Sequence, residues 1–319
     1  MQNLTYFQKY LHKSLGKNNQ IYFKHINNKS FKKEKFKSFT RATKRFNKNK
    51  LIKEGGKRVK GYYRNSLRNK PLITVITVVF NSDKDLEKTI KSVLLQKYKN
   101  IEYIIIDGGS NGSVISKIKK YENFIDYWIS QKDHGIFDAF NKGIMLARGD
   151  YICFLNVGDY YTEKAMNYIV KIIKIKKEVD IIFGSVKKKK VFSGFNEKNI
   201  KKTLNIFPSL MSTVINIKLF KNYGLFNLKY KNYNDYEFIY RILRCKKLNY
   251  STTNKNEIIS IFDLHGYSSK INILTRLYEE LKIRVKYENI FSSLIMIIIK
   301  FFRYFFLRYA NPEKYNKYN

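Results

Sequence analysis

Residues 71–81, with the sequence PLITVITVVFN, decide the fold of this chain. Every residue from Leu72 to Phe80 is apolar or a β-branched threonine, which is typical of a strand buried on both faces of a parallel sheet. Asn81, a common turn residue, ends the run. The segment therefore predicts a central strand of an α/β sheet.

Helix and strand patterns alternate after this strand. Residues 84–96 predict an amphipathic helix, because Leu86, Ile90 and Val93 recur at helical spacing. Later segments predict strands over residues 101–106, 127–130, 151–155 and 180–184, and helices over residues 114–121, 136–147 and 163–177. This alternation predicts a doubly wound, mostly parallel sheet. We expect Lys187–Lys190 in an exposed turn and mixed structure over residues 191–265.

Polar or glycine-rich loops follow three of the predicted strands: residues 79–81, residues 107–110 (DGGS) and residues 156–159 (NVGD). Because parallel strands end at the same edge of a sheet, these loops should line one ligand cleft. Asp107 could accept hydrogen bonds from a base or a ribose, or it could only cap the next helix. Asp159 offers a hard oxygen suited to Mg²⁺ or Mn²⁺, although a solvated turn would also explain it.

The predicted helix over residues 136–147 has a polar side. Asp138, Asn141 and Lys142 lie there at i, i+3 and i+4, away from the apolar stripe. This side could face a ligand, and Lys142 would suit a phosphate, although a lysine on a helix is more often solvated.

Together these blocks resemble the family 2 glycosyltransferases with a GT-A fold, particularly those of bacterial polysaccharide biosynthesis. The resemblance spans about residues 71–240. It is carried by residues 71–81, residues 92–96 (SVLLQ), residues 104–110 (IIIDGGS), residues 133–143 (DHGIFDAFNKG) and residues 149–152 (GDYI). It implies a GT-A domain over residues 71–268, between a basic N-terminal extension (residues 1–70) and a C-terminal amphipathic helical region (residues 269–319).

The resemblance also implies a site for a nucleotide-diphosphate sugar donor. In this sequence the donor-binding residues would be Phe80, Asn81, Asp107, Asp138, Asn141, Lys142 and Asn156. The D-x-D cluster with which the family binds a divalent metal, here Mg²⁺ or Mn²⁺, falls on Asn156, Gly158 and Asp159. Asp159 is thus left as the one carboxylate ligand of the metal.

The resemblance places the general base of an inverting sugar transfer in residues 234–237, NDYE. Carboxylates at i and i+2 point to opposite sides of a helix, so Asp235 and Glu237 cannot both reach the cleft from one helix. We choose Asp235 as the catalytic base. The alternative is that Asn234 or Asp235 merely caps the helix.

The chain is strongly basic, with a formal charge of +38. Residues 1–70 carry 21 Lys and Arg against 2 acidic residues. This charge suggests a negatively charged partner, although a compositional bias toward lysine would also explain it.

Phe and Tyr side chains interleaved with Lys keep a nucleic-acid-binding protein as an alternative. Steeply salt-dependent retention of RNA or DNA would distinguish it. A sugar nucleotidyltransferase is less favoured, because the first strand is not followed by a glycine-rich phosphate loop.

Residues 271–309 show helical periodicity, and residues 291–306 are markedly apolar but interrupted by Lys300 and Arg303. The uninterrupted apolar run is too short to span a bilayer, so an amphipathic helix at the interface or packed on the domain is preferred. For a glycosyltransferase of this kind, we expect the acceptor to be a glycan or lipid-linked glycan presented at an anionic membrane surface. The two cysteines show no metal or disulfide spacing, and no secretory signal pattern is apparent. We expect a cytoplasmic protein, peripheral at the inner face of the plasma membrane.

Overall fold

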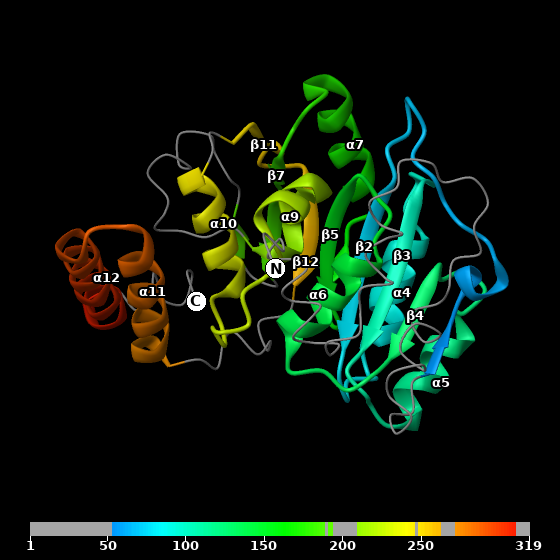
Figure 1. Ribbon diagram of the computed structural model, residues 1–319, viewed down its shortest axis with the longest axis horizontal. Helices are drawn as coiled ribbons and strands as arrows, with labels where there is room; N and C mark the ends of the chain where they lie inside the picture. The colour runs from blue at the N-terminus through cyan, green and yellow to red at the C-terminus, as the bar shows by residue number, and fades with distance from the viewer. Residues whose placement is uncertain (1–52, 189–190, 194–208, 246–247, 263–271, 311–319) are drawn as a thin grey trace, which may run out of the picture.

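The computed structural model describes residues 53–188, 191–193, 209–245, 248–262 and 272–310 (Figure 1). A large sheet runs through the middle of the molecule. Within the described residues it has eight strands, in the order β1 (Lys53–Gly55), β4 (Tyr127–Ser130), β3 (Ile101–Asp107), β2 (Ile73–Val79), β5 (Tyr151–Asn156), β10 (Thr213–Asn216), β7 (Ile181–Phe183) and β11 (Tyr250–Thr252).

The sheet is mixed but mostly parallel, as the sequence predicts. Strands β4, β3, β2 and β5 run parallel to one another, and β11 runs parallel to β7. β1 is antiparallel to β4, and β10 is antiparallel to both of its neighbours. The predicted central strand is β2, and it is buried along its whole length.

Helices cover both faces of this sheet. One face carries α4 (Leu86–Leu94), α5 (Gly112–Lys120) and α7 (Ala165–Lys176), and the other carries α6 (Ile136–Leu146), α9 (Ile217–Tyr223) and α10 (Asn234–Cys245). Alternate residues of β2 enter the two cores, because side chains of a strand point to opposite faces. Ile73 and Val75 pack on the first face, whereas Ile76 and Val78 pack on the second.

A smaller sheet lies beside the large one. Its strands within the described residues are β6 (Tyr160–Tyr161), β12 (Ile258–Phe262), β8 (Ser185–Lys188) and β9 (Val191–Ser193). The prediction of a turn over Lys187–Lys190 is wrong for Lys187 and Lys188, which belong to β8, although Lys187 is exposed as expected. The reason is tertiary, since β8 pairs in parallel with β12, a strand far away in the sequence. Lys189 and Lys190 lie outside the described residues.

Part of the basic N-terminal segment packs on the domain. β1 pairs with β4, and the short 3-10 helix η1 (Lys57–Lys60) follows it. The guanidinium of Arg58 is buried, where it pairs with Glu102 and donates to the backbone oxygen of Leu146 over 2.7 Å. Residues 53–60 therefore add an edge strand to the sheet, whereas residues 1–52 lie outside the described residues.

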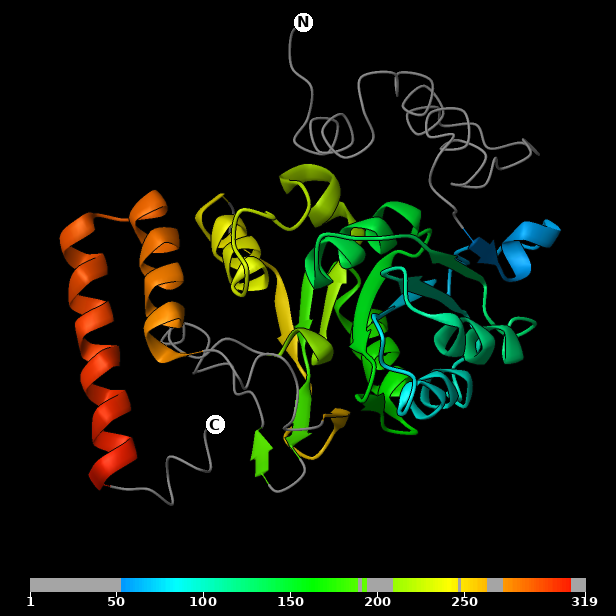
Figure 2. The ribbon, with the colours of Figure 1, turned by 90° about the horizontal axis from the view of Figure 1, so that it is seen from below.

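The C-terminal region forms a helical hairpin at one end of the molecule (Figure 2). It consists of α11 (Ile273–Tyr287) and α12 (Ile290–Ala310), with α11 packed on α10. The break falls at Asn289, whose side chain accepts a hydrogen bond from the backbone N–H of Phe291 at 2.8 Å and so caps α12. No helix in the described parts of the chain is long and apolar enough to cross a membrane.

Candidate functional site

The register of the sheet brings the predicted strand-end residues to one edge. Asp107 is opposite Val79 of β2 on one side and Ser130 of β4 on the other. Asn156 is opposite Val78 on the far side of β2. Carboxyl-terminal ends of adjacent parallel strands, where open α/β sheets bind ligands, therefore lie side by side here.

The loop after β2 is tied to the loop after β3. The backbone N–H of Asn81 donates to Ser110 Oγ at 2.8 Å, and the Asn81 side chain accepts from the backbone N–H of Asn111 at 3.3 Å. Asn81 has a positive φ of 48°, which asparagine tolerates better than most residues. Phe80 precedes it with 62% of its surface exposed, so its ring offers an apolar surface at the edge of the sheet.

Asp107 is completely buried and organises this loop. Its carboxylate accepts hydrogen bonds from the backbone N–H of Ser110 at 3.0 Å and from the hydroxyl of Ser130 at 2.5 Å. A weaker bond at 3.3 Å comes from the backbone N–H of Gly109. Asp107 therefore joins β3 to β4 and shapes the glycine loop that faces the candidate cleft.

Asp133 also lies at this edge of the sheet, and the sequence alone predicted no role for it. It follows β4, and one of its oxygens accepts from the backbone N–H of Gly135 at 2.9 Å. A Cβ atom added at Gly108 would lie 2.5 Å from its other oxygen, so the carboxylate and the glycine loop are in close contact. Burial raises the pKa of Asp133. Its position directly after a parallel strand was the signal that could have identified it.

The polar side chains of α6 make hydrogen bonds to other parts of the protein. Asn141 is completely buried, and its amide donates to the backbone oxygen of Phe226 at 2.9 Å and accepts from the backbone N–H of Phe226 at 3.0 Å. Asp138 accepts from the backbone N–H of His134 at 3.0 Å. Lys142 lies 3.5 Å from Asp138 and donates to the backbone oxygen of Lys132 at 3.0 Å. These side chains therefore set the position of α6 beside the strand-end loops.

The loop after β5 is a tight turn. The backbone N–H of Asp159 donates to the backbone oxygen of Asn156 at 3.1 Å, and Gly158 has a φ of 97°, the left-handed conformation that favours glycine. The turn is anchored to α4 through Thr89. Its hydroxyl donates to the backbone oxygen of Asp159 at 2.8 Å and accepts from the backbone N–H of Gly158 at 3.1 Å.

The same turn holds two oxygen groups that suit a hard cation. The amide oxygen of Asn156 is buried without a hydrogen-bond partner in the described part of the chain, and Asp159 is 8% exposed. No group of three or more His, Cys, Asp and Glu within the described residues could hold a metal ion. The turn thus fits a cation that takes its remaining ligands from water and substrate phosphates, as Mg²⁺ commonly does.

Asp235 lies in the first turn of α10, on the face of the sheet that also carries α6. Desolvation raises the pKa of Asp235 to about 6, although a hydrogen bond from the backbone N–H of Tyr236 at 2.8 Å acts in the opposite direction. The carboxylate of Glu237 makes contacts with other groups. It is completely buried, pairs with Arg241 at 3.3 Å and accepts from the hydroxyl of Tyr287 in α11 at 2.7 Å.

Curated proteins similar to this chain are glycosyltransferases. An uncharacterized glycosyltransferase of Mycobacterium tuberculosis is 42% identical over 93 residues, which cover 29% of this chain and 36% of that protein. The match thus spans little more than a third of that relative. An uncharacterized glycosyltransferase of Rickettsia typhi is 26% identical over 245 residues, which cover 72% of this chain and 73% of that protein.

Solved structures share the fold. TarS of S. aureus in complex with UDP-GlcNAc matches with a TM-score of 0.56 and 16% identity, covering 67% of this chain and 66% of that chain. The mannosyltransferase PcManGT from Pyrobaculum calidifontis, in complex with GDP-Man and Mn²⁺, matches with a TM-score of 0.54 and 13% identity, covering 80% and 74%. These likenesses confirm the GT-A fold expected from the sequence.

The family pattern covers the same part of the chain as the strand-end loops. The pattern described as "Glycosyl transferase family 2" matches residues 74–252, more than half of the chain. This range includes β2, the glycine loop after β3, the turn after β5 and the start of α10. The chain therefore belongs to glycosyl transferase family 2.

Proposed function

We propose that this chain transfers a sugar from a nucleotide-diphosphate donor to a hydroxyl group of an acceptor, with inversion at the anomeric carbon. The observation that carries the proposal is the convergence of the loops after β2, β3 and β5 at one sheet edge in a family 2 chain. The complexes of the two solved neighbours with UDP-GlcNAc and GDP-Man support a donor of this class.

The donor nucleotide would lie along the strand-end loops. The exposed ring of Phe80 would pack against the base, and the loop held by Asp107 would border it. Asn81, Asp138, Asn141, Lys142 and Asn156 complete the proposed donor site, with Asn141 and Asp138 acting through the position of α6.

Asp235 is the proposed catalytic base. It takes the proton of the acceptor hydroxyl while the hydroxyl oxygen forms a bond to the anomeric carbon, and the bond from that carbon to the diphosphate breaks. A pKa of about 6 suits this step, because the carboxylate is ionised near neutral pH and still binds a proton readily. The nucleoside diphosphate leaves with the electron pair.

Asp159 and the amide oxygen of Asn156 are the proposed ligands of Mg²⁺ or Mn²⁺, which would neutralise the charge of the leaving diphosphate. The Mn²⁺ of the archaeal neighbour PcManGT supports a metal of this kind. Since one carboxylate serves where relatives often have two, the cation should bind together with the nucleotide rather than before it.

A test of the donor site is thermal stabilisation by a panel of nucleoside diphosphates, with and without Mn²⁺. We expect one base to raise the melting temperature most, and Mn²⁺ to enlarge that rise in the original protein but not in Asp159→Ala. Equal responses to all bases, with no effect of Mn²⁺, would contradict the proposed donor and metal sites.

A test of the base compares Asp235→Asn with Glu163→Gln, an exposed ion-pair residue that serves as the matched control. Asp235→Asn should keep nucleotide binding and lose transfer by about 100-fold or more, the lower range of general-base contributions. Glu163→Gln should keep both. Unchanged transfer in Asp235→Asn would reject the assignment of the base.

The acceptor is proposed to be a glycan or a lipid-linked glycan at the inner face of the plasma membrane. The support is the strongly basic composition, which favours an anionic surface, and the aromatic C-terminal region.

A further inference from the structure

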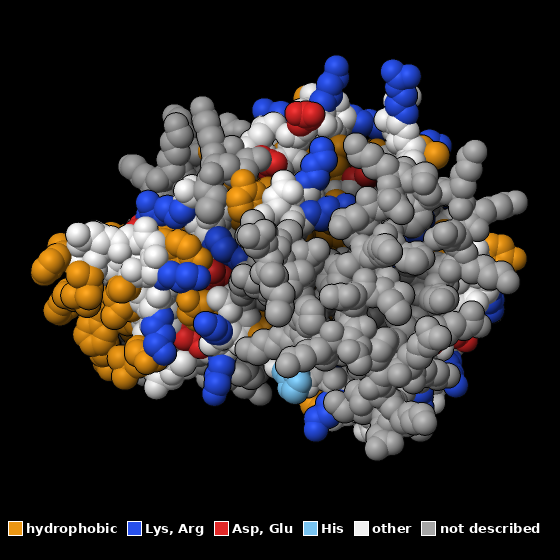
Figure 3. All heavy atoms as spheres, viewed as in Figure 1, with side chains coloured by type: hydrophobic (Ala, Val, Ile, Leu, Met, Phe, Trp, Pro, Cys, Tyr) orange, Lys and Arg blue, Asp and Glu red, His pale blue; other side chains and the backbone are white. Residues whose placement is uncertain are grey.

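The C-terminal helix α12 exposes apolar side chains along its whole length. Phe291, Phe302, Phe306 and Tyr309 have exposed fractions between 66% and 73%. Ile290, Leu294, Ile295, Ile298 and Ile299 are exposed beside them. At 100° per residue these nine side chains cover about half of the helix circumference. We call this surface the α12 arc, and Figure 3 shows hydrophobic side chains gathered at that end of the molecule.

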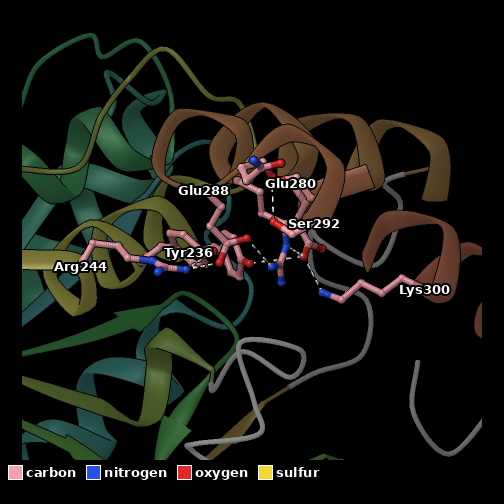
Figure 4. Close-up of polar contacts among 10 residues, drawn as sticks. Tyr236, Arg244, Glu280, Glu288, Ser292 and Lys300 are labelled. Atoms are coloured by element: carbon pink, nitrogen blue, oxygen red, sulfur yellow. Dashed lines mark hydrogen bonds and ion pairs between the residues drawn. The ribbon is translucent and has the colours of Figure 1, made fainter. Parts of the chain in front are cut away.

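Two polar side chains of α12, Lys300 and Ser293, face the rest of the protein. Lys300 donates to Glu280 of α11 at 2.5 Å (Figure 4). Ser293 is completely buried. A surface helix of a globular protein has the opposite arrangement, with its apolar stripe on the core. The arc is therefore turned away from the domain by specific polar contacts.

An ion-pair network joins this hairpin to α10. Arg284 binds Glu280 at 2.8 Å and Glu288 at 3.3 Å, and Glu288 also pairs with Arg244 of α10. The hydroxyl of Tyr236, next to the proposed base, donates to Glu280 at 3.3 Å (Figure 4). Because the charged groups are shared between three helices, the arc has a defined orientation relative to α10.

The positive net charge of the chain favours an anionic partner for the α12 arc. A second copy of this chain would bring another +38 formal charge against the first, whereas an anionic lipid surface is attracted to it. Lys286 of α11 is half exposed, and Lys282 lies 4.3 Å from the ring centre of the exposed Tyr278. Cations next to exposed aromatic rings are typical of protein surfaces that lie at the headgroup level of a bilayer.

We propose that the α12 arc is a membrane-docking surface, lying in the plane of an anionic bilayer with its phenylalanine and isoleucine side chains among the acyl chains. The proposal deepens the function proposed above and rests on it, because it names the surface at which a lipid-linked acceptor would be met.

The first experiment is sedimentation of the full chain with vesicles of phosphatidylglycerol and phosphatidylcholine, at an ionic strength of about 0.15 M. The double variant Phe291→Ser/Phe302→Ser should partition about tenfold or more weakly, because two large apolar side chains no longer enter the bilayer. The matched control is Leu95→Ser/Phe124→Ser, which removes two exposed apolar side chains, one just after α4 and one in the segment before β4. It should bind like the original protein.

The second experiment measures insertion directly and separates it from attraction by charge alone. Trp128, the one tryptophan of the chain, is 1% exposed, so a Phe302→Trp variant adds a reporter over a constant background. Its emission should shift to shorter wavelength with these vesicles and be quenched by lipids brominated in their acyl chains. Vesicle binding without quenching would overturn the proposal.

Three further outcomes separate this proposal from its alternatives. A dimer in the absence of vesicles that dissociates in the double variant would assign the arc to a second copy and overturn membrane docking. Transfer to a short soluble acceptor should be unchanged in the double variant. If that transfer occurs but no protein binds vesicles, the docking surface fails alone; if no protein transfers sugar yet vesicles bind, the proposed function fails alone.

Discussion

Asp235, the proposed catalytic base, lies in surroundings that disfavour its ionised form. Its pKa of about 6, raised by desolvation, predicts that the rate of transfer falls as the pH decreases below about 6, because the base becomes protonated. The measurement is kcat/KM as a function of pH. An acid limb near pH 4 would indicate that the ionised form is not disfavoured in the free enzyme.

The same desolvation predicts an effect of pH on stability. The folded state holds a proton on Asp235 more tightly than the unfolded state, so its stability decreases as the pH rises from about 4 to 6 and this loss is complete above that window. Asp235→Asn removes the charge but keeps an acceptor for the N–H of Tyr236. It should therefore raise the unfolding free energy at pH 7.5 by about 1–3 kcal/mol. Urea denaturation tests this, and lower stability in the variant would contradict it.

Asn141 was predicted to bind the donor, but its hydrogen bonds also stabilise the fold. Its side chain satisfies both backbone groups of Phe226, 85 residues away. Asn141→Ala should cost about 2–4 kcal/mol of unfolding free energy, because two buried polar groups lose their partners. The exposed Asn123→Ala is the control and should change it by less than about 0.5 kcal/mol. An unchanged stability with lost nucleotide binding would instead show that Asn141 acts only on the donor.

At the scale of elements, the edge segment β1–η1 is joined to β3 by a buried ion pair. Arg58 pairs with Glu102 of β3, which also accepts from Thr74 Oγ1 at 2.6 Å and the backbone N–H of Arg148 at 2.8 Å. Arg58→Ala should destabilise the protein by about 3–5 kcal/mol, because it leaves a buried carboxylate without its cation. Lys60→Ala, which removes an exposed contact to Asn123, is the control and should have little effect.

Equal stability of Arg58→Ala and Lys60→Ala in urea denaturation would contradict the expected contribution of the buried ion pair. Arg58→Met combined with Glu102→Gln should recover much of the loss, since it removes both charges and keeps an amide oxygen that can accept from Thr74 Oγ1 and the backbone N–H of Arg148.

At the scale of the whole molecule, stability is unevenly distributed. Two large cores sandwich the sheet, whereas the contact between α10 and α11 is built on a small cluster of Tyr236, Tyr240 and Ile283. Amide hydrogens of α12 should therefore exchange with solvent about tenfold or more faster than those of β2. Hydrogen-exchange mass spectrometry measures this, with α6 as a helix that should exchange as slowly as the sheet. Equal protection of α12 and β2 would contradict the expectation.

The amino-acid sequence by itself determined the succession of strands and helices and the edge at which the loops meet. The apolar run over residues 72–80 predicted β2, and the predicted strand over residues 127–130 matches β4. Both predictions succeed because the apolar run of a buried strand is a local signal. The direction of parallel strands then brought the ends of β2, β3 and β5 to one edge without knowledge of the tertiary structure.

The tertiary structure alone decided which distant groups meet. The pairing of β1 with β4, the inclusion of Lys187 in β8, the contact of Asn141 with Phe226 and the outward direction of the α12 arc all depend on partners far away in the sequence. A periodic pattern reports that a side chain is buried or exposed, but it does not identify the partner. Hydrogen bonds and ion pairs between remote segments exist only once the sheet has brought those segments together.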